Sequence, residues 1–322
     1  MTRRVRLRSL AKINLDLRVL QRRDDGYHEL RTVFQTISLA DVIAVEYTPA
    51  KRTSLVIDDA LAIPNNLILR AADAALQAMK VRAAIHIKLQ KHIPMGAGLG
   101  GGSSNAAAIL LALPVLAGRP IPLEKLADMG AALGSDVPFF LHGGTALGLG
   151  RGTEMYPLAD IKREPILLLT SGIHVGTAQA YQNLSPKLTS QALSPKINGF
   201  QRYVRMLESR HSAGAASELG ANDFESAVFE LQPQLKKLYD RLRKVCAGTE
   251  VVPRMTGSGS ALFVAFESLK ACEQVRLLLN TSRLGAGVKV IGARVVDGAG
   301  YRKLWRRQLG LVDAELTWPP RS

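Results

Sequence analysis

The chain has 322 residues, enough for one large domain or two modest ones, and its 47% hydrophobic and 21% charged residues are typical of a globular enzyme. Its two cysteines, Cys246 and Cys272, are too few for a disulfide framework or a cysteine-based metal site. No apolar stretch is long enough to span a membrane. The net charge of +15 is spread along the chain beside only 5% aromatic residues, unlike the clustered stripe of a nucleic-acid-binding protein.

The first predicted element is a strand over residues 4–20. No apolar signal-peptide core precedes it, so we expect a cytoplasmic protein without a membrane partner. Residues 12 to 17 alternate, with Lys12, Asn14 and Asp16 at even positions and apolar residues at odd ones. Taken alone, this stretch favours a sheet whose polar face is solvated.

A polar turn over residues 24–29 follows and displays Tyr27 and His28. Strands are then predicted over 30–37 and 41–47, an amphipathic helix over 67–79, and a strand over 84–89. A β-rich first part before the glycine-rich loop is unlike a doubly wound nucleotide fold, in which that loop follows the first strand.

A glycine-rich loop joins the strand over 84–89 to an apolar helix. Gly96, Gly98, Gly100, Gly101 and Gly102 let the backbone lie close to a ligand, and we expect Ser103, Ser104 and Asn105 to cap the helix. A helix start offers free N–H groups and the positive end of a dipole, which predicts a phosphate site. A surface linker is the alternative, and the strand–loop–helix context disfavours it.

The middle of the chain contains a predicted helix over 123–133 and a turn with Asp136. A carboxylate there is either a helix N-cap or a functional acid or base, and the turn alone favours the cap. A Gly-rich strand and turn follow over 143–152, and a fresh strand begins at Pro165. The composition predicts a domain boundary near residues 155–165.

The second half alternates helices and strands. We expect helices over 177–181, 200–208 and 269–279, and one longer helix over 224–242 that is capped at Asn222. Residues 254–261 form a second Gly/Ser loop that leads into a strand over 262–266, and another strand covers 288–296. The pattern predicts an α+β fold with domains at 1–160 and 161–300, followed by a basic, poorly packed tail over 301–322.

Several phosphate-binding motifs are excluded for the glycine loop. The sequence lacks a Walker loop, the acidic partner of a dinucleotide fingerprint, and the protein-kinase signatures. Pro94-Met-Gly-Ala-Gly-Leu-Gly-Gly-Gly-Ser-Ser-Asn-Ala instead resembles the second signature of the GHMP kinases, the family of galactokinase, homoserine, mevalonate and phosphomevalonate kinases. Ala11-Lys-Ile-Asn-Leu resembles the first family motif and Arg254-Met-Thr-Gly-Ser-Gly-Ser-Ala the third, in the family's order.

The resemblance implies a two-domain α+β fold, with an N-terminal domain like that of a small-subunit ribosomal protein and an active site in the cleft between the domains. Asp25-Gly-Tyr-His, Gly134-Ser-Asp-Val-Pro-Phe-Phe and Asn222-Asp-Phe-Glu resemble one branch of the family. That branch uses ATP and Mg²⁺ to phosphorylate the 2-hydroxyl of an erythritol unit carried on cytidine diphosphate, in the non-mevalonate route to isoprenoids. A homoserine- or mevalonate-type kinase is the alternative, and a basic nucleic-acid-binding protein a more distant one.

The resemblance also implies roles for individual residues. Asp136 would be the catalytic base and Lys12 its partner, while the Mg²⁺ ligands stay open beyond Ser103 and Ser104. The ATP-binding residues would be Asn65, Pro94, Met95, Gly96, Ala97, Gly98, Leu99, Gly100, Gly101, Gly102, Ser103 and Ser104. The substrate-binding residues would be Asn14, Tyr27, His28, Thr177 and Tyr181, and the supporting loop would contain Gly257, Ser258 and Gly259. An ordinary exposed turn is the alternative for Tyr27 and His28. The partners expected are small molecules alone, with a monomer or weak homodimer.

Overall fold

The computed structural model of the protein describes residues 1–162, 164–188, 193–209, 220–247, 249, 251–282, 284–285, 287–311 and 318–320. Its central feature is a long antiparallel hairpin made of β1 (Arg3–Arg22) and β2 (His28–Pro49). The two strands expected over 30–37 and 41–47 are one continuous strand. A bulge explains this, because the pairing shifts between Leu10↔Ala40 and Ala11↔Ile37, and β2 pairs with β1 on both sides of the bulge.

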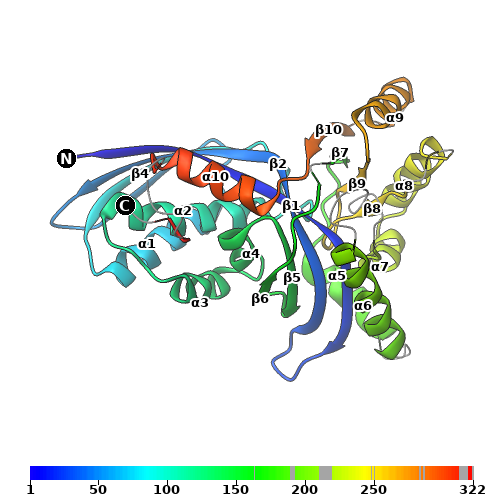
Figure 1. Ribbon diagram of the computed structural model, residues 1–322, viewed down its shortest axis with the longest axis horizontal. Coiled ribbons are helices and arrows are strands. Elements are labelled where there is room, and N and C mark those ends of the chain that lie inside the picture. The colour runs from blue at the N-terminus through cyan, green and yellow to red at the C-terminus, as the bar shows by residue number, and fades with distance from the viewer. Residues whose placement is uncertain are drawn as a thin grey trace.

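The hairpin belongs to the first sheet, whose strand order is β3-β4-β2-β5-β6 with β1 on β2 (Figure 1). The other strands are β3 (Ser54–Asp59), β4 (Ala83–Gln90), β5 (Thr145–Gly150) and β6 (Glu154–Pro157). Its helices are α1 (Leu67–Met79), α2 (Gly101–Ala117), α3 (Leu123–Leu133) and α4 (Val137–His142). The bounds expected for the helices over 67–79 and 123–133 are confirmed.

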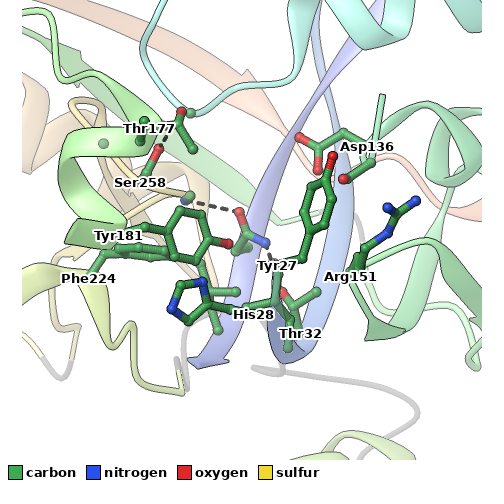
Figure 2. Close-up of a pocket in the computed structure, with 18 of the residues that line it drawn as sticks. Tyr27, His28, Thr32, Asp136, Arg151, Thr177, Tyr181, Phe224 and Ser258 are labelled. Atoms are coloured by element: carbon green, nitrogen blue, oxygen red, sulfur yellow. Dashed lines mark hydrogen bonds between the residues drawn. The ribbon is translucent and has the colours of Figure 1, made fainter. Parts of the chain in front are cut away.

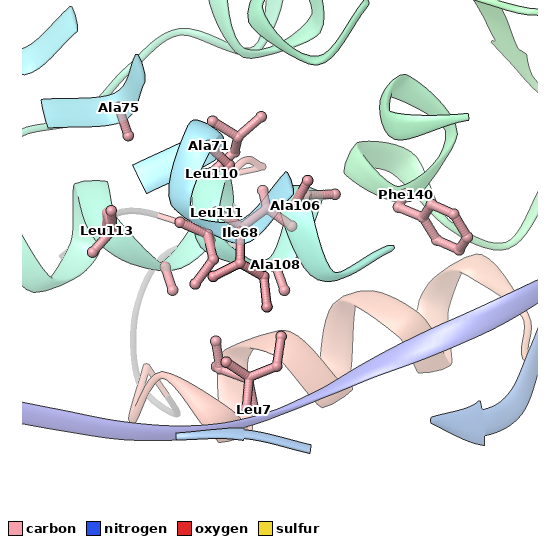
Figure 3. Packing of buried hydrophobic residues seen from close by; sticks show 14 of the residues in the cluster. Leu7, Ile68, Ala71, Ala75, Ala106, Ala108, Leu110, Leu111, Leu113 and Phe140 are labelled. Carbon is pink, nitrogen blue, oxygen red and sulfur yellow. The ribbon is translucent and has the colours of Figure 1, made fainter. Parts of the chain in front are cut away.

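Helix α2 forms the centre of the first core and is buried on nearly every side. Leu7 of β1 packs in the same cluster as α1 and α2 residues (Figure 3). Pro114 lies inside α2 and does not end it. The helix ends at Gly118, whose left-handed backbone (φ 64°) places its N–H on the carbonyl of Val115.

The second sheet has the order β10-β7-β9-β8, and its neighbouring strands are antiparallel. Its strands are β7 (Pro165–Thr170), β8 (Arg254–Met255), β9 (Leu262–Ala265) and β10 (Lys289–Arg294). Five helices accompany it: α5 (Thr177–Leu188), α6 (Leu193–Ser209), α7 (Phe224–Leu231), α8 (Pro233–Val245) and α9 (Leu269–Thr281).

The single helix expected over 224–242 is wrong, because the chain breaks at Gln232 between α7 and α8. Gln232 has non-helical backbone (φ −131°, ψ 77°), and Pro233, which has no N–H to donate, begins α8. The N-cap of α7 is Asp223, whose side chain makes no capping bond. Asn222, one residue earlier, accepts a hydrogen bond at its Oδ1 from the N–H of Phe224 at 2.9 Å.

Strand β1 joins the two halves. Its odd-numbered Ile13 and Leu15 share a buried cluster with Ile166 and Leu168 of the second sheet. The polar residues between them are buried as well, since Lys12 is 3%, Asn14 4% and Asp16 0% exposed. The expectation of a solvated polar face is therefore wrong: both faces of the strand are covered. Because the first sheet ends at Pro157 and the second begins at Pro165, we propose domain limits at residues 160 and 161.

The expectation of a poorly packed tail is wrong for the described residues of 301–322. Helix α10 (Gly298–Gln308) returns to the first domain (Figure 1). Its Tyr301 and Trp305, each 1% exposed, belong to the core of that domain. The indole of Trp318 donates to the carbonyl of Leu141 at 2.8 Å. Burial of Tyr301 and Trp305 stabilises this packing. The many basic residues around them made the segment look like an exposed tail in the sequence. Residues 312–317 and 321–322 lie outside the described part.

Candidate active site

A pocket of about 910 Å³ lies where the hairpin, the glycine loop and α5 meet. It receives side chains from both halves of the chain (Figure 2). The predicted site residues that line it are Lys12, Asn14, Tyr27, His28, Gly96, Gly98, Ser103, Asp136, Thr177, Tyr181, Gly257, Ser258 and Gly259. The fold therefore brings together segments that are more than a hundred residues apart in the sequence.

The charged centre of the pocket is an ion pair between Lys12 and Asp136. The Lys12 Nζ lies 3.4 Å from Asp136 Oδ2, and the side chains are 4% and 32% exposed. Asp136 occupies the N-cap position of α4, yet its side chain makes no capping hydrogen bond. Its carboxylate is therefore free to face the pocket, against the cap that the turn alone favoured.

Asn14 connects the ion pair to the second domain. Its Oδ1 accepts from Lys12 Nζ at 2.8 Å and from the N–H of Gly257 at 2.9 Å. Its amide nitrogen donates to Thr32 Oγ1 at 2.8 Å. These bonds fix the orientation of Asn14, and through it the position of the Lys12 ammonium.

The glycine loop turns its carbonyl groups toward the protein. The carbonyl of Leu99 accepts from the N–H of Lys12 at 3.0 Å, and that of Ala97 accepts from the N–H of Ala261 at 3.1 Å. Within the described residues, the N–H groups from Gly96 to Ser103 donate to no protein acceptor. An anion bound at this loop would therefore meet N–H donors, while the carbonyl oxygens of Ala97 and Leu99 point to the protein.

The capping role expected for Ser103, Ser104 and Asn105 is wrong, because α2 already begins at Gly101 and all three residues lie inside it. Gly100, with φ at 69°, is its N-cap and makes no side-chain bond. Ser104 is buried and its Oγ donates to the carbonyl of Leu10 at 2.6 Å. Of the three, only Ser103 lines the pocket.

Residues 256–260 hold the glycine loop from the other side. A Cβ on Gly98 would lie 2.1 Å from the carbonyl oxygen of Thr256, so the two backbones touch there. Ser258 Oγ lies 3.1 Å from Thr177 Oγ1, which ties the same loop to α5. Both loops are therefore fixed against each other across the pocket.

Aromatic side chains form the far end of the pocket. The rings of His28 and Tyr181 are stacked, with centroids 4.6 Å apart and planes 20° apart. The guanidinium of Arg151 lies 4.4 Å from the ring centroid of Tyr27, and Figure 2 shows Tyr27 between Arg151 and the Tyr181–His28 pair. Phe224 packs edge-on against Tyr181 at 4.8 Å. Burial and the Arg22 charge both lower the pKa of His28, which favours a neutral imidazole.

Some predicted ATP-binding residues do not line this pocket: Asn65, Pro94, Met95, Ala97, Leu99, Gly100, Gly101, Gly102 and Ser104. Ala97 and Leu99 are buried beneath the loop, and Met95 points outward with 59% exposure.

Other lining residues had no recognisable signal in the sequence: Arg22, Thr32, Arg151, His174 and Ser185. They reach the pocket through strand register and domain docking, although the glycines on both sides of Arg151 mark its turn.

The donor groups suit Mg²⁺ that arrives with a nucleotide. Asp136 is the carboxylate among the described lining residues, and the Ser103 hydroxyl faces the same pocket. The described residues contain no group of three acidic, histidine or cysteine side chains that could hold a metal alone. Mg²⁺ typically takes one or two carboxylates together with substrate phosphates, so this set fits.

Comparisons with known proteins identify the family of the chain. Residues 66–144 match the family model for the GHMP kinases N terminal domain. A 4-diphosphocytidyl-2-C-methyl-D-erythritol kinase from Solibacter usitatus is 46% identical over 332 aligned residues, covering 100% of this chain and 98% of the relative. The enzyme of that name from Thermotoga maritima is 40% identical, covering 80% and 90%.

Solved structures give the same result. A crystal structure of 4-(cytidine 5'-diphospho)-2C-methyl-D-erythritol kinase has a TM-score of 0.71 and 32% identity, covering 90% of this chain and 98% of that one. A homoserine kinase from Cytophaga hutchinsonii, at 17% identity and TM-score 0.68 over 91% and 97%, shares the fold. The expected α+β GHMP kinase fold is confirmed. The chain belongs to the 4-diphosphocytidyl-2-C-methyl-D-erythritol kinase family of the GHMP kinases.

Proposed function

We propose that the protein transfers the γ-phosphoryl group of ATP to the 2-hydroxyl of 4-diphosphocytidyl-2-C-methyl-D-erythritol, in the non-mevalonate pathway to isoprenoids. The observation that carries this proposal is the Lys12–Asp136 pair, 3.4 Å apart at the junction of the glycine loop and the aromatic end of the pocket. Phosphoryl transfer needs such a base between a phosphate cradle and an acceptor site.

Asp136 is the proposed base. The acceptor oxygen forms a bond to the γ-phosphorus while its proton passes to the Asp136 carboxylate, and the bond to the β–γ bridging oxygen breaks to release ADP. The Lys12 ammonium stabilises negative charge on the attacking oxygen. Asn14 holds Lys12 in that position through its 2.8 Å hydrogen bond.

The glycine loop is the proposed triphosphate site. Its free N–H groups from Gly96 to Ser103 would donate to phosphate oxygens, and His174 lies beside Gly96 at the mouth of the same loop. Mg²⁺, held by the phosphates with Ser103 and Asp136, would neutralise charge on the transferred group. Asn65 lies two residues before α1, outside the pocket, and its contact with the nucleotide stays a prediction.

The aromatic end is the proposed site of the cytidine group. Tyr27 and Tyr181 offer ring faces, His28 offers a polar edge, and Thr177 stands between this end and the supporting loop. Arg22 and Arg151 supply cations for the acceptor's diphosphate. An ATP-dependent enzyme of small metabolites works where ATP is made and used, so we propose a cytoplasmic location.

The test is the initial rate of ADP formation with three acceptors at equal concentration: 4-diphosphocytidyl-2-C-methyl-D-erythritol, homoserine and mevalonate. We expect turnover with the first acceptor alone, because the other two have no base for the aromatic end. Turnover with homoserine or mevalonate would instead assign the chain to another GHMP activity. Tight nucleic-acid binding that weakens steeply with salt, without turnover of any acceptor, would favour the remaining alternative.

A further inference from the structure

Ser185 of α5 makes two hydrogen bonds that together determine where its hydroxyl proton lies. Its Oγ lies 3.1 Å from His28 Nε2 and 2.9 Å from the carbonyl oxygen of Tyr181, one helical turn earlier in α5. A serine hydroxyl has one proton to donate, and a carbonyl oxygen can only accept. The hydroxyl proton of Ser185 therefore points to the Tyr181 carbonyl. Serine residues in helices commonly donate to the carbonyl four residues earlier in this way.

This arrangement fixes the protons of His28. The Ser185 hydroxyl donates its hydrogen bond to the Tyr181 carbonyl, so toward His28 it can only accept. His28 Nε2 is therefore the donor and carries the proton of the neutral imidazole. Nδ1 then carries a lone pair, and no described residue donates a hydrogen bond to it. Burial and the charge of Arg22 favour the neutral form by lowering the pKa of His28.

The imidazole of His28 borders the proposed base site. His28 lines the pocket, and its ring is nearly parallel to that of Tyr181, with an angle of 20° between the planes (Figure 2). A base that meets the edge of this ring in the plane of the imidazole is parallel to Tyr181 as well. Stacking is tolerant of base identity, so discrimination between pyrimidines needs a donor or acceptor at such an edge.

Resting on the proposed function, we propose that Ser185 is a positioning residue that makes the pocket selective for cytosine over uracil. It does so by holding His28 in the tautomer whose Nδ1 accepts. Cytosine presents its 4-amino group to that atom and donates, whereas uracil presents a carbonyl oxygen and leaves two acceptors facing each other. Two buried acceptors that face each other without a proton between them lose binding free energy.

The kinetic test compares two acceptors that differ only in carrying cytosine or uracil, using kcat/KM. Ser185→Ala frees His28 to take either tautomer, and we expect the preference for cytosine to fall about tenfold, which corresponds to one neutral hydrogen bond. The KM for ATP should not change. Ser185→Thr keeps a hydroxyl and should restore the preference. Gln179→Ala, on an exposed position of the same helix, is the matched control.

A spectroscopic test works without turnover. The ¹⁵N chemical shifts of His28, assigned by comparison with His28→Asn, distinguish a protonated Nε2 from a protonated Nδ1. We expect the Nε2–H tautomer in the wild type and a mixture in Ser185→Ala. A wild-type Nδ1–H tautomer, or an unchanged base preference in active Ser185→Ala, would overturn this inference. Absence of phosphoryl transfer to the cytosine acceptor in the wild type would instead refute the proposed function.

Discussion

Lys12 and Asp136 show that a charged side chain can be buried when its partners are fixed. Lys12 is almost fully covered, but it has the Asp136 carboxylate at 3.4 Å and Asn14 Oδ1 at 2.8 Å. Removing one partner of such a pair costs more than the pair contributes, because the other charge stays buried. The pair is therefore expected to serve chemistry more than stability.

Asp136→Asn tests the role of this carboxylate directly. We expect kcat to fall about 10³-fold, since an amide cannot accept the acceptor's proton. The dissociation constant of ATP, measured by calorimetry without Mg²⁺, should stay within a few-fold because the phosphate donors are untouched. Asp128→Asn, at an exposed position of α3, is the control. An active Asp136→Asn enzyme would show that Asp136 is structural.

Acid should weaken acceptor binding through His28. Its pKa in the folded protein lies below the ordinary 6.5 because of burial and Arg22, so the imidazole stays neutral until the pH falls below that value. Protonation then converts Nδ1 into a donor and adds a positive charge beside Arg22 and Tyr181. We expect the KM for the acceptor to rise several-fold as the pH falls below 6.5, with a flatter profile in His28→Asn. The same rise in both proteins would assign the effect to another group.

At the scale of elements, the glycine loop is held by backbone contacts that exclude any side chain at Gly98. A Cβ there would meet Thr256 at 2.1 Å, and φ at 74° is itself unfavourable for alanine. We expect Gly98→Ala to lower the free energy of unfolding by at least about 2 kcal/mol and to raise the KM for ATP. Urea unfolding measures the first effect.

Gly102→Ala is the matched control for stability. Its Cβ would lie 3.8 Å from the side chain of Leu67 in α1, an ordinary van der Waals contact. We expect it to keep or raise stability by about 0.5–1 kcal/mol, since alanine favours a helix interior. Equal destabilisation by both substitutions would contradict the role of the Gly98 contact.

Most elements could be predicted from the sequence where local signals agree. The apolar period and flanking breakers placed α1 and α3 at their observed bounds. Local sequence signals did not predict element bounds that depend on contacts with residues far along the chain. A bulge paired with β1 makes β2 continuous, and Gly100, not Ser103, caps α2 because the loop must lie against β1. The break at Gln232 shows that one proline can divide an otherwise continuous apolar period.

At the scale of the whole molecule, α10 returns from the second domain to complete the core of the first. Trp305 is 1% exposed there. We expect Trp305→Ala to reduce the free energy of unfolding by about 3–5 kcal/mol, which is typical for a buried aromatic residue. Leu277→Ala, at a position 60% exposed on α9, is the control and should change it by less than about 0.5 kcal/mol. Equal effects would contradict the docking of α10.

The candidate site was predictable only as far as its motifs reach. Lys12, Asp136, Tyr27 and His28 came from family resemblance, and the fold brings them to one pocket. Local pattern alone favoured a solvated Lys12 and a capping Asp136, because burial of a strand on both faces depends on the docking of a second sheet. Ser185 gave no signal, since a helix serine gains its role only when His28 lies beside it.

We propose that the protein transfers one phosphoryl group to a tertiary hydroxyl. Carbon 2 of the acceptor carries a methyl group and no hydrogen, so a phosphate on its oxygen has no three-bond coupling to a carbon-bound proton. We predict that proton-coupled ³¹P NMR of the reaction with ATP, Mg²⁺ and 4-diphosphocytidyl-2-C-methyl-D-erythritol gives one new phosphomonoester singlet, with the diphosphate signals retained. A split monoester signal, loss of the diphosphate, or no new signal from folded protein would contradict it.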